Sequence, residues 1–269
     1  MPDPSRPIPP RIIAVANQKG GVGKTTTAIN LAAALAETGL RVLVVDLDPQ
    51  GNASTGLGIE AGNRDRTTYD LLLDEAELHE VIQDTGFEGM GIVPATVDLS
   101  SADIELISNE KRSFLLHDAL RQPAMDSFSW DFILIDCPPS LNLLTVNAMV
   151  AADSVMVPLQ SEFFALEGLS QLMLTIREVR QTANPKLRIE GVVLTMYDRR
   201  NNLSQQVEQD ARDNLGDLIF DTVIPRNVRV SEAPSYAVPV LVYDSASQGA
   251  KAYRALAAEL LARRAKQAA

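Results

Sequence analysis

The chain has 269 residues, a formal net charge of −11 and a hydrophobic content of 46%. This length supports a large buried core, and the composition is ordinary for a globular protein, which argues against a fibrous or wholly disordered chain. The sequence has no run of 18 apolar residues, so no membrane-spanning helix is expected, and its first ten residues lack the apolar core of a signal peptide.

Apolar runs rich in β-branched residues alternate with helical patterns along the chain. In chain order we expect strand 11–17, helix 25–39, strands 41–48 and 90–95, helix 98–121, strand 130–140, helix 141–152, strand 154–160, helix 165–182, strand 188–198, helix 203–216, strand end 221–227 and helix 247–266. This alternation indicates an α/β fold, a mostly parallel twisted sheet with helices on both faces. We expect residues 11–269 to form a single domain and the Pro-rich residues 1–10 to be a disordered tail.

The segment NQKGGVGKTT, residues 17–26, lies between the first expected strand and the first helix. It approaches the phosphate-loop pattern G-x-x-x-x-G-K-[ST], but Gln18 replaces the first glycine and a second lysine, Lys19, follows it. Its glycines let backbone N–H groups converge on phosphate oxygens, at the positive end of the helix. Lys24 would reach the β- and γ-phosphates, and the Thr25 hydroxyl would hold Mg²⁺. The alternative is a Gly-rich turn with incidental lysines.

Three aspartates end two of the apolar strands. Asp136 ends FILID, where a Walker B acid would assist Mg²⁺ directly or through water. Asp46 and Asp48 end VLVVDLD, and either could position an attacking water. Phosphoryl transfer depends on positioning and charge neutralisation, which acids at the carboxyl ends of strands could supply. Two alternatives remain open: Asp136 could cap a loop, and the other two could be turn acids.

The negative charge is concentrated in the first half of the chain. Residues 1–135 hold 10 Lys and Arg against 20 Asp and Glu, whereas Arg177 to Lys266 holds 14 against 11. Net charge limits non-specific association but does not exclude a local basic surface. Each candidate phosphate contact on such a surface could instead be a solvated side chain or part of an ion pair. The candidates are Arg199, Arg200, Arg226, Arg229, Lys251 and Arg254.

Six segments, in the same order from about Arg11 to about Arg263, together carry a family resemblance. They are KGGVGKTTT, DLDPQGN, LIDCPPS, EFFALEGL, VVLTMYDRR and IPRNVRVSEAPS. They resemble the ParA/Soj chromosome-partitioning ATPases, which belong with MinD and the nitrogenase iron protein to the deviant Walker A group of P-loop NTPases. The resemblance implies ATP and Mg²⁺ as cofactors, an ATP-bound homodimer with two nucleotides at its interface, and non-specific binding of double-stranded DNA. It also implies slow hydrolysis that a ParB-like centromere-binding protein stimulates, which releases the dimer from DNA.

The resemblance also implies roles for individual residues. Lys19 matches the signature lysine that reaches the partner subunit's nucleotide, Asp48 the acid that orients water, and Asp136 the Walker B acid. Asp46 matches a second acid that assists the metal indirectly. The implied catalytic residues are Lys19, Lys24 and Asp48, and the implied metal site is Thr25, Asp48 and Asp136. The implied ATP contacts are Lys19, Gly20, Gly21, Val22, Gly23, Lys24, Thr25, Thr26, Met196, Pro225, Arg226 and Asn227. The implied DNA contacts are Arg199, Arg200, Arg229, Lys251 and Arg254.

Three other classes of protein could also contain a phosphate loop of this kind, and the sequence argues against each of them. A MinD-like membrane-associated ATPase needs a C-terminal amphipathic anchor, but the tail ARRAKQAA has no large apolar residue. An electron-transfer ATPase of the nitrogenase type needs two cysteine ligands from each subunit, and Cys137 is the only cysteine of the sequence. A small-molecule kinase or ligase would not need Lys19. The lone cysteine also fits a reducing cytoplasm, and the family implies association with the nucleoid.

Some choices within the family stay open. Related ATPases position plasmids or other cargo on the nucleoid, and the closeness of the motifs favours the chromosome origin region. Because the phosphate loop begins within the first 20 residues, we expect no N-terminal helix-turn-helix domain and no site-specific DNA binding. The pair Phe163 and Phe164 could form an exposed aromatic site, although packing at a strand-to-helix junction is favoured. His79 and His117 lack metal-ligand spacing.

Overall fold

A seven-stranded sheet forms the centre of the computed structural model, which describes residues 9–121, 129–162 and 165–268. The strand order is β3-β4-β2-β5-β1-β6-β7, and all neighbours are parallel except the β3–β4 pair. The strands are β1 (Arg11–Val15), β2 (Val42–Asp46), β3 (Gln83–Asp84), β4 (Met90–Val93), β5 (Phe132–Asp136), β6 (Ser154–Gln160) and β7 (Arg188–Thr195). The predicted α/β fold with a mostly parallel sheet is confirmed. The antiparallel strand β3 was not predicted, because two residues are too short to show a periodic pattern.

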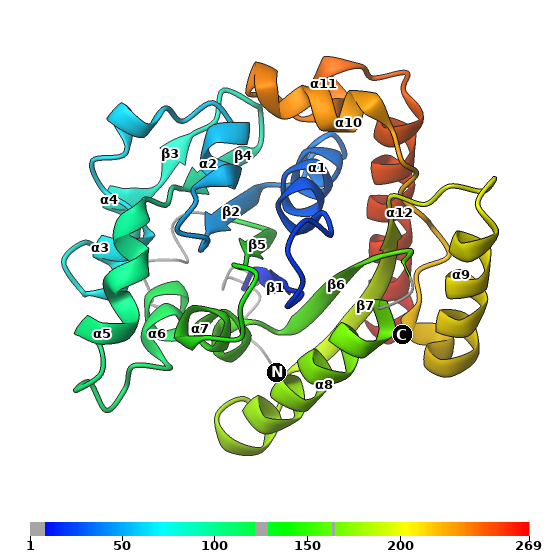
Figure 1. Cartoon of the computed structure of the whole chain (residues 1–269). Coiled ribbons are helices and arrows are strands. Elements are labelled where there is room, and N and C mark those ends of the chain that lie inside the picture. The colour runs from blue at the N-terminus through cyan, green and yellow to red at the C-terminus, as the bar shows by residue number, and fades with distance from the viewer. Residues whose placement is uncertain (1–8, 122–128, 163–164, 269) are drawn as a thin grey trace.

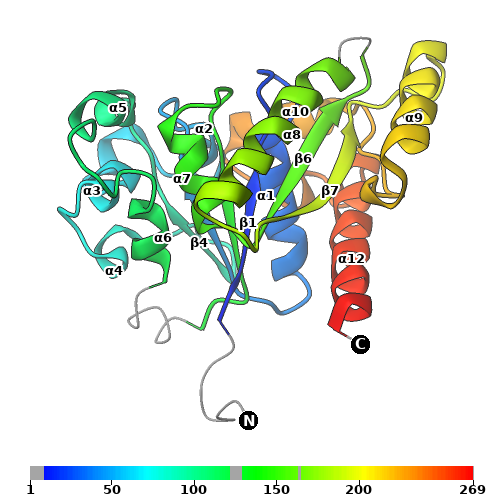
Figure 2. The ribbon, with the colours of Figure 1, turned by 90° about the horizontal axis from the view of Figure 1, so that it is seen from below.

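Helices cover both faces of the sheet (Figures 1 and 2). They are α1 (Lys24–Ala36), α2 (Asn52–Gly56), α3 (Thr68–Leu72), α4 (Leu78–Val81), α5 (Ala102–Glu105), α6 (Leu115–Leu120), α7 (Leu143–Ala151), α8 (Ala165–Thr182), α9 (Asn202–Leu215), α10 (Val228–Glu232), α11 (Val240–Tyr243) and α12 (Gln248–Ala268). Short 3-10 turns lie at Ala61–Asn63, Val97–Ser101, Gly216–Leu218 and Ala233–Tyr236. No helix in the described part of the chain is long and apolar enough to cross a bilayer.

Alternate residues of each central strand enter two separate hydrophobic cores. On β1, Ile12 and Ala14 pack into the core that α7 and α8 cover, whereas Ile13 packs into the core that α1 and α12 cover. Figure 1 shows α1 beside the red α12, with α7 and α8 on the opposite side of the strands. Full burial of one such aliphatic side chain stabilises the fold by about 1.5–3 kcal/mol. Since both faces are buried, each central strand appears in the sequence as a continuous apolar run.

The predicted helix 98–121 is wrong as a single element. The structure divides it into the 3-10 turn at Val97–Ser101, α5, and α6 after a turn-rich segment. Asn147 of α7 holds that segment in its turn conformation: its Nδ2 donates to the Arg112 carbonyl at 2.8 Å, and its Oδ1 accepts from the Leu116 N–H at 3.2 Å. A contact from a distant helix therefore overrides the local helical pattern.

The expected strand end at 221–227 is also wrong. This segment forms no strand and pairs with the chain just beyond β7 through one isolated bridge, between Tyr197 and Pro225. The backbone N–H of Tyr197 donates to the Ile224 carbonyl at 3.0 Å, and the Arg226 N–H donates to the Tyr197 carbonyl at 3.0 Å. The other predicted strands and helices are present with boundaries shifted by a few residues. Residues 1–8 of the predicted tail, and the side chains of Phe163 and Phe164, lie outside the described residues.

Candidate nucleotide site

The loop between β1 and α1 is shaped by glycine backbone conformations that other residues rarely adopt. Gly21 and Gly23 have φ angles of 73° and 88°, and Gly23 directly precedes the first turn of α1. Neighbouring strands hold this loop in place. The Thr195 hydroxyl on β7 donates to the Val22 carbonyl at 2.8 Å, and the Asn17 amide donates to the Pro158 carbonyl on β6 at 2.7 Å. The result is a preformed concave backbone at the positive end of a 13-residue helix.

Lys24 lies at the first position of α1 and is 6% exposed. Its Nζ donates to the Lys19 carbonyl at 3.1 Å, which leaves donors of the ammonium for other acceptors. Burial lowers the Lys24 pKa from its ordinary value, and the nearby Asp136 opposes that shift. A buried ammonium with spare donors beside a glycine-rich loop is suited to phosphate oxygens.

The structure separates the two acids that follow β2. Asp46 is fully buried and its carboxylate accepts three hydrogen bonds from its own loop: the Ser54 N–H at 2.8 Å, the Ser54 hydroxyl at 2.7 Å and the Asp48 N–H at 3.2 Å. Burial raises the Asp46 pKa to about 6. Asp48 instead lines the cavity beside the phosphate loop, and its Oδ1 accepts only the Gln50 N–H at 3.0 Å among the described residues. Asp46 therefore anchors the loop, whereas Asp48 faces the cavity.

Asp136 is a buried carboxylate whose charge lacks full compensation. Neither of its oxygens has a hydrogen-bond partner of normal geometry in the described structure. Burial raises its pKa well above the ordinary value, and the nearby Thr25 hydroxyl and Lys24 ammonium offset part of that shift. Asp136 lies directly opposite Asp46 in the β2–β5 register. An unpartnered buried carboxylate beside a hydroxyl and a second carboxylate fits a hard divalent cation such as Mg²⁺.

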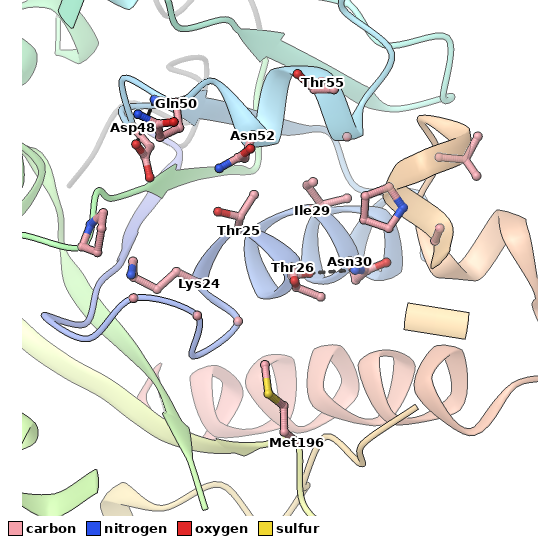
Figure 3. Close-up of a pocket in the computed structure, with 18 residues that line it drawn as sticks. Lys24, Thr25, Thr26, Ile29, Asn30, Asp48, Gln50, Asn52, Thr55 and Met196 are labelled. Carbon is pink, nitrogen blue, oxygen red and sulfur yellow. Dashed lines mark hydrogen bonds between the residues drawn. The ribbon is translucent and has the colours of Figure 1, made fainter. Parts of the chain in front are cut away.

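A cavity of about 460 Å³ lies over the phosphate loop. Figure 3 shows Lys24, Thr25 and Asp48 at one end of it, with Thr26 and Asn30 along α1. The other walls come from Gln50, from α2 and from the segment after α10. The lining residues are Gly20, Gly21, Gly23, Lys24, Thr25, Thr26, Ile29, Asn30, Asp48, Gln50, Asn52, Thr55, Gly56, Pro139, Met196, Ala233, Pro234 and Val238.

A second cavity of about 220 Å³ adjoins the first and shares Gly23, Thr26, Met196 and Pro234 with it. Its remaining walls include three residues predicted to contact ATP, namely Pro225, Arg226 and Asn227. Met196 has a φ of 51°, a conformation that costs a non-glycine residue free energy and is often found at binding sites. The two cavities together have the size of a cofactor site.

Two cavity residues, Thr55 and Asn30, were not singled out from the sequence. Thr55 lies on the short helix α2, and Asn30 lies on α1 one turn after Thr26. Asn30 donates to the Thr26 carbonyl at 2.7 Å and accepts from the Val240 N–H at 2.7 Å, so it joins α1 to α11. A polar residue in an apolar helical run was the available clue, but it does not show which segment the amide would bind.

Lys19 does not line the cavity of its own chain. Its Nζ forms an ion pair with Glu162 Oε2 at 2.8 Å, and the two side chains are 43% and 47% exposed. The two lysines of the loop thus point to different surroundings: Lys24 is buried toward the cavity, and Lys19 is half-exposed at its rim.

The candidate DNA contacts lie on the surface near the carboxyl ends of the strands or on α12. Arg199, Arg200 and Lys251 are exposed, and Arg200 pairs with Asp198 at 3.1 Å. Arg229 pairs with Glu232 at 2.9 Å and with Asp244 at 3.3 Å. Arg254 pairs with Glu37 at 2.6 Å. Arg200 and Arg229 remain exposed although they are paired, so they can still contact other anions. Arg254 is held more firmly, because it donates two hydrogen bonds to Glu37 and two to Ser245.

Comparison with known proteins decides the family. Residues 10–189 match the family model described as an AAA domain. The chromosome partitioning protein ParA of Caulobacter vibrioides is 58% identical over 255 residues, covering 95% of each chain. The sporulation initiation inhibitor protein Soj of Bacillus subtilis is 51% identical, covering 94% of this chain and 98% of Soj. The chain belongs to the ParA/Soj family of chromosome-partitioning ATPases.

Solved structures of similar proteins share this fold. Cobyrinic acid a,c-diamide synthase of Mycobacterium smegmatis, solved with bound ADP and magnesium, is 40% identical with a TM-score of 0.81, and 94% of each chain is covered. The cell division ATPase MinD of Pyrococcus furiosus is 30% identical with a TM-score of 0.75, covering 93% of this chain and 98% of MinD. As a ParA/Soj protein, this chain is a P-loop ATPase whose cofactors are ATP and Mg²⁺. Thr25, Asp48 and Asp136 carry oxygens of the kind that Mg²⁺ prefers and could hold it here, where it would neutralise charge on the phosphates.

Proposed function

We propose that this chain is a DNA-partitioning ATPase in which ATP binding drives a nucleotide-sandwich homodimer that binds DNA without sequence preference. The observation that carries the proposal is the contrast between the two lysines of the phosphate loop. Lys24 is buried beside the cavity of its own chain, whereas Lys19 is half-exposed and lines no part of that cavity. A cation at the rim of one site is available to the nucleotide of a second copy.

In this proposal the chain's own residues bind ATP and position its hydrolysis. The loop from Gly20 to Thr26 holds the phosphates, and Met196 with the segment Pro225–Asn227 holds the adenine. Asp48 faces the cavity and orients the attacking water, while Asp46 keeps the loop that carries Asp48 in place. Little covalent chemistry is required of the protein in phosphoryl transfer, so this positioning accounts for the activity.

The proposal extends to the partners and the cellular location. A ParB-like centromere-binding protein stimulates the slow hydrolysis and releases the dimer from DNA, which segregates the chromosome origin region. The protein acts in the cytoplasm on the nucleoid and has no membrane step. The identity of 58% with a ParA protein and 51% with Soj supports the chromosome rather than a plasmid or other cargo.

A DNA-binding assay in three nucleotide states tests the proposed function. Two unrelated duplexes are titrated with the protein in Mg·ATP, in Mg·ADP and without nucleotide, at about 50 and 200 mM salt. We expect binding only with ATP, with equal affinity for both duplexes and a steep loss at the higher salt. Binding to anionic vesicles instead of DNA would favour the MinD-like alternative, and ATP turnover without any binding would favour the small-molecule kinase or ligase.

Replacing Arg199, Arg200 and Arg229 by alanine is expected to weaken DNA binding equally on unrelated sequences. Each lost phosphate contact should reduce the slope of log affinity against log salt by about 1. The matched control replaces Arg180, Lys186 and Arg188, which are exposed and lie between the end of α8 and the start of β7, at the amino edge of the sheet. The assignment is contradicted if the control weakens binding as much as the test variant, or if only one duplex loses affinity.

The ion pair between Lys19 and Glu162 must open before Lys19 can reach a second subunit. Because both side chains are more than 40% exposed, the pair contributes about 1 kcal/mol at most, after screening by solvent is taken into account. We therefore expect Glu162→Gln, which removes one such pair from each of the two subunits, to strengthen ATP-dependent dimerisation by no more than about thirtyfold. Sedimentation velocity in Mg·ATP measures this change, and loss of the dimer would show that Glu162 itself belongs to the interface.

A further inference from the structure

One wall of the nucleotide cavity is a short segment, residues 48–56, that consists of a turn and the five-residue helix α2. Asp48, Gln50, Asn52, Thr55 and Gly56 of this segment all line the cavity. A helix of one and a half turns is not stable by itself, so contacts from outside the segment must fix its position. These contacts therefore decide how precisely Asp48 is held.

Arg64 contacts this segment from a separate loop, in addition to the hydrogen bonds that Asp46 accepts from Ser54 and Asp48. Its Nη2 donates to the Thr55 hydroxyl at 2.8 Å and to the Ile59 carbonyl at 2.7 Å. Its Nε donates to the same Ile59 carbonyl at 3.1 Å, and its Nη1 donates to the Ala95 carbonyl beyond β4 at 2.9 Å. The planar guanidinium thus connects three parts of the structure by hydrogen bonds: α2, the chain that follows α2, and the carboxyl edge of the sheet.

The connection continues from Arg64 to the turn that carries Asp48. The Thr55 hydroxyl, which accepts from Arg64, donates to the Gly51 carbonyl at 3.1 Å, and the Gly51 N–H donates to the Asp48 carbonyl at 2.8 Å. The guanidinium also packs so closely on Gly51 that a Cβ at this position would collide with Nη1. Ala95 is held from its other side as well, because its N–H donates to the Ser54 hydroxyl at 3.0 Å.

The other interactions of Arg64 do not explain why an arginine lies at this position. It forms no ion pair within 4.0 Å with any described carboxylate, and burial lowers its pKa from the ordinary value. Three of its four hydrogen bonds go to backbone carbonyls, which a surface arginine serving solubility would not require. The neighbouring Arg66, by contrast, donates a hydrogen bond to the Glu75 carbonyl at 3.1 Å and forms an ion pair with Asp70 at 3.8 Å, away from residues 48–56.

We propose that Arg64 is a positioning residue for ATP hydrolysis, which fixes residues 48–56 as a wall of the cavity and thereby holds Asp48 toward the nucleotide. This inference rests on the proposed function, in which Asp48 orients the attacking water. Lysine could not replace arginine here, because one ammonium cannot reach the Thr55, Ile59 and Ala95 oxygens in a fixed plane. Small displacements of a positioning group cost large factors in rate, whereas the phosphate loop and the adenine segment still bind ATP.

The test compares Arg64→Lys and Arg64→Gln with Arg66→Lys and Arg66→Gln in the full chain. Single-turnover hydrolysis, ATP affinity and Tm are measured for each. We expect both Arg64 variants to lose about tenfold or more in hydrolysis rate, with ATP affinity within about threefold of wild type, and both Arg66 variants to be unchanged. In Arg64→Ala, added methylguanidinium should restore part of the rate, and it should restore none in Asp48→Ala.

Two outcomes overturn the inference. One is an unchanged hydrolysis rate in the Arg64 variants; the other is a rate loss matched by equal losses of ATP affinity and Tm, which would indicate a general folding role. Asp48→Ala separates this result from the proposed function. If Asp48→Ala hydrolyses ATP at the wild-type rate, the role assigned to Asp48 is wrong. If Asp48→Ala is slow but the Arg64 variants hydrolyse ATP at the wild-type rate, only the positioning role of Arg64 is wrong.

Discussion

Replacing Lys19 by alanine is expected to abolish ATP-dependent dimerisation while ATP binding by the single chain remains measurable. Lys19 lines no part of its own cavity, and the residues that do, including Lys24 and the glycines, are unchanged by the substitution. In a two-fold symmetric dimer each lost contact counts twice. A charge-assisted contact contributes about 1.5–3 kcal/mol, so the dimerisation constant should fall by about 10²–10⁴.

The matched control for this experiment is Lys186→Ala. Lys186 is also exposed to solvent, but it precedes β7 and so lies at the amino edge of the sheet, away from the phosphate loop. Light scattering in Mg·ATP should give a single-chain mass for Lys19→Ala and a two-chain mass for wild type and Lys186→Ala. If Lys19→Ala gives a two-chain mass at the same protein concentrations as wild type, Lys19 does not contribute to the interface.

Replacing Asp48 by alanine is expected to lower the rate of ATP hydrolysis by about 10²-fold or more, the scale of a lost proton-accepting or water-orienting group. Assembly should persist, because the phosphate loop and Lys19 are intact, so dimers should accumulate on DNA. Phosphate release measures the first effect and the lifetime of the DNA complex measures the second. Asp48→Asn is the companion variant, since it keeps the shape of the side chain while removing its charge. Wild-type turnover in both variants would contradict a role for Asp48 in hydrolysis.

The sequence allowed the sheet and the phosphate loop to be predicted because both depend on contiguous residues. Buried parallel strands appear as unbroken apolar runs, and the loop is defined by glycines, a lysine and a threonine at fixed spacing beside Lys19. The helix predicted at 98–121 failed for the opposite reason. Asn147, which lies far along the chain, binds Arg112 and Leu116 backbone groups and stabilises turns there.

The family resemblance distinguished Asp48 from Asp46, but the partner that binds Asp46 could not be predicted from its position in the sequence. Both follow the same apolar strand, and only the structure shows that Asp46 is bound by Ser54 while Asp48 faces the cavity. The same holds for Arg64, whose partners at Thr55 and Ala95 are brought to it by the fold. Long-range hydrogen bonds of this kind have no periodicity or motif that a single sequence could reveal.

The proposed coupling of nucleotide, dimer and DNA is tested most directly by sedimentation velocity of the wild-type chain with a fluorescent duplex of arbitrary sequence. We predict that the duplex sediments with pairs of protein chains in Mg·ATP, and that in Mg·ADP the protein is a single chain and the duplex is free. Single chains that bind the duplex equally well in both nucleotides would contradict the account, as would an ATP-bound dimer that leaves the duplex free.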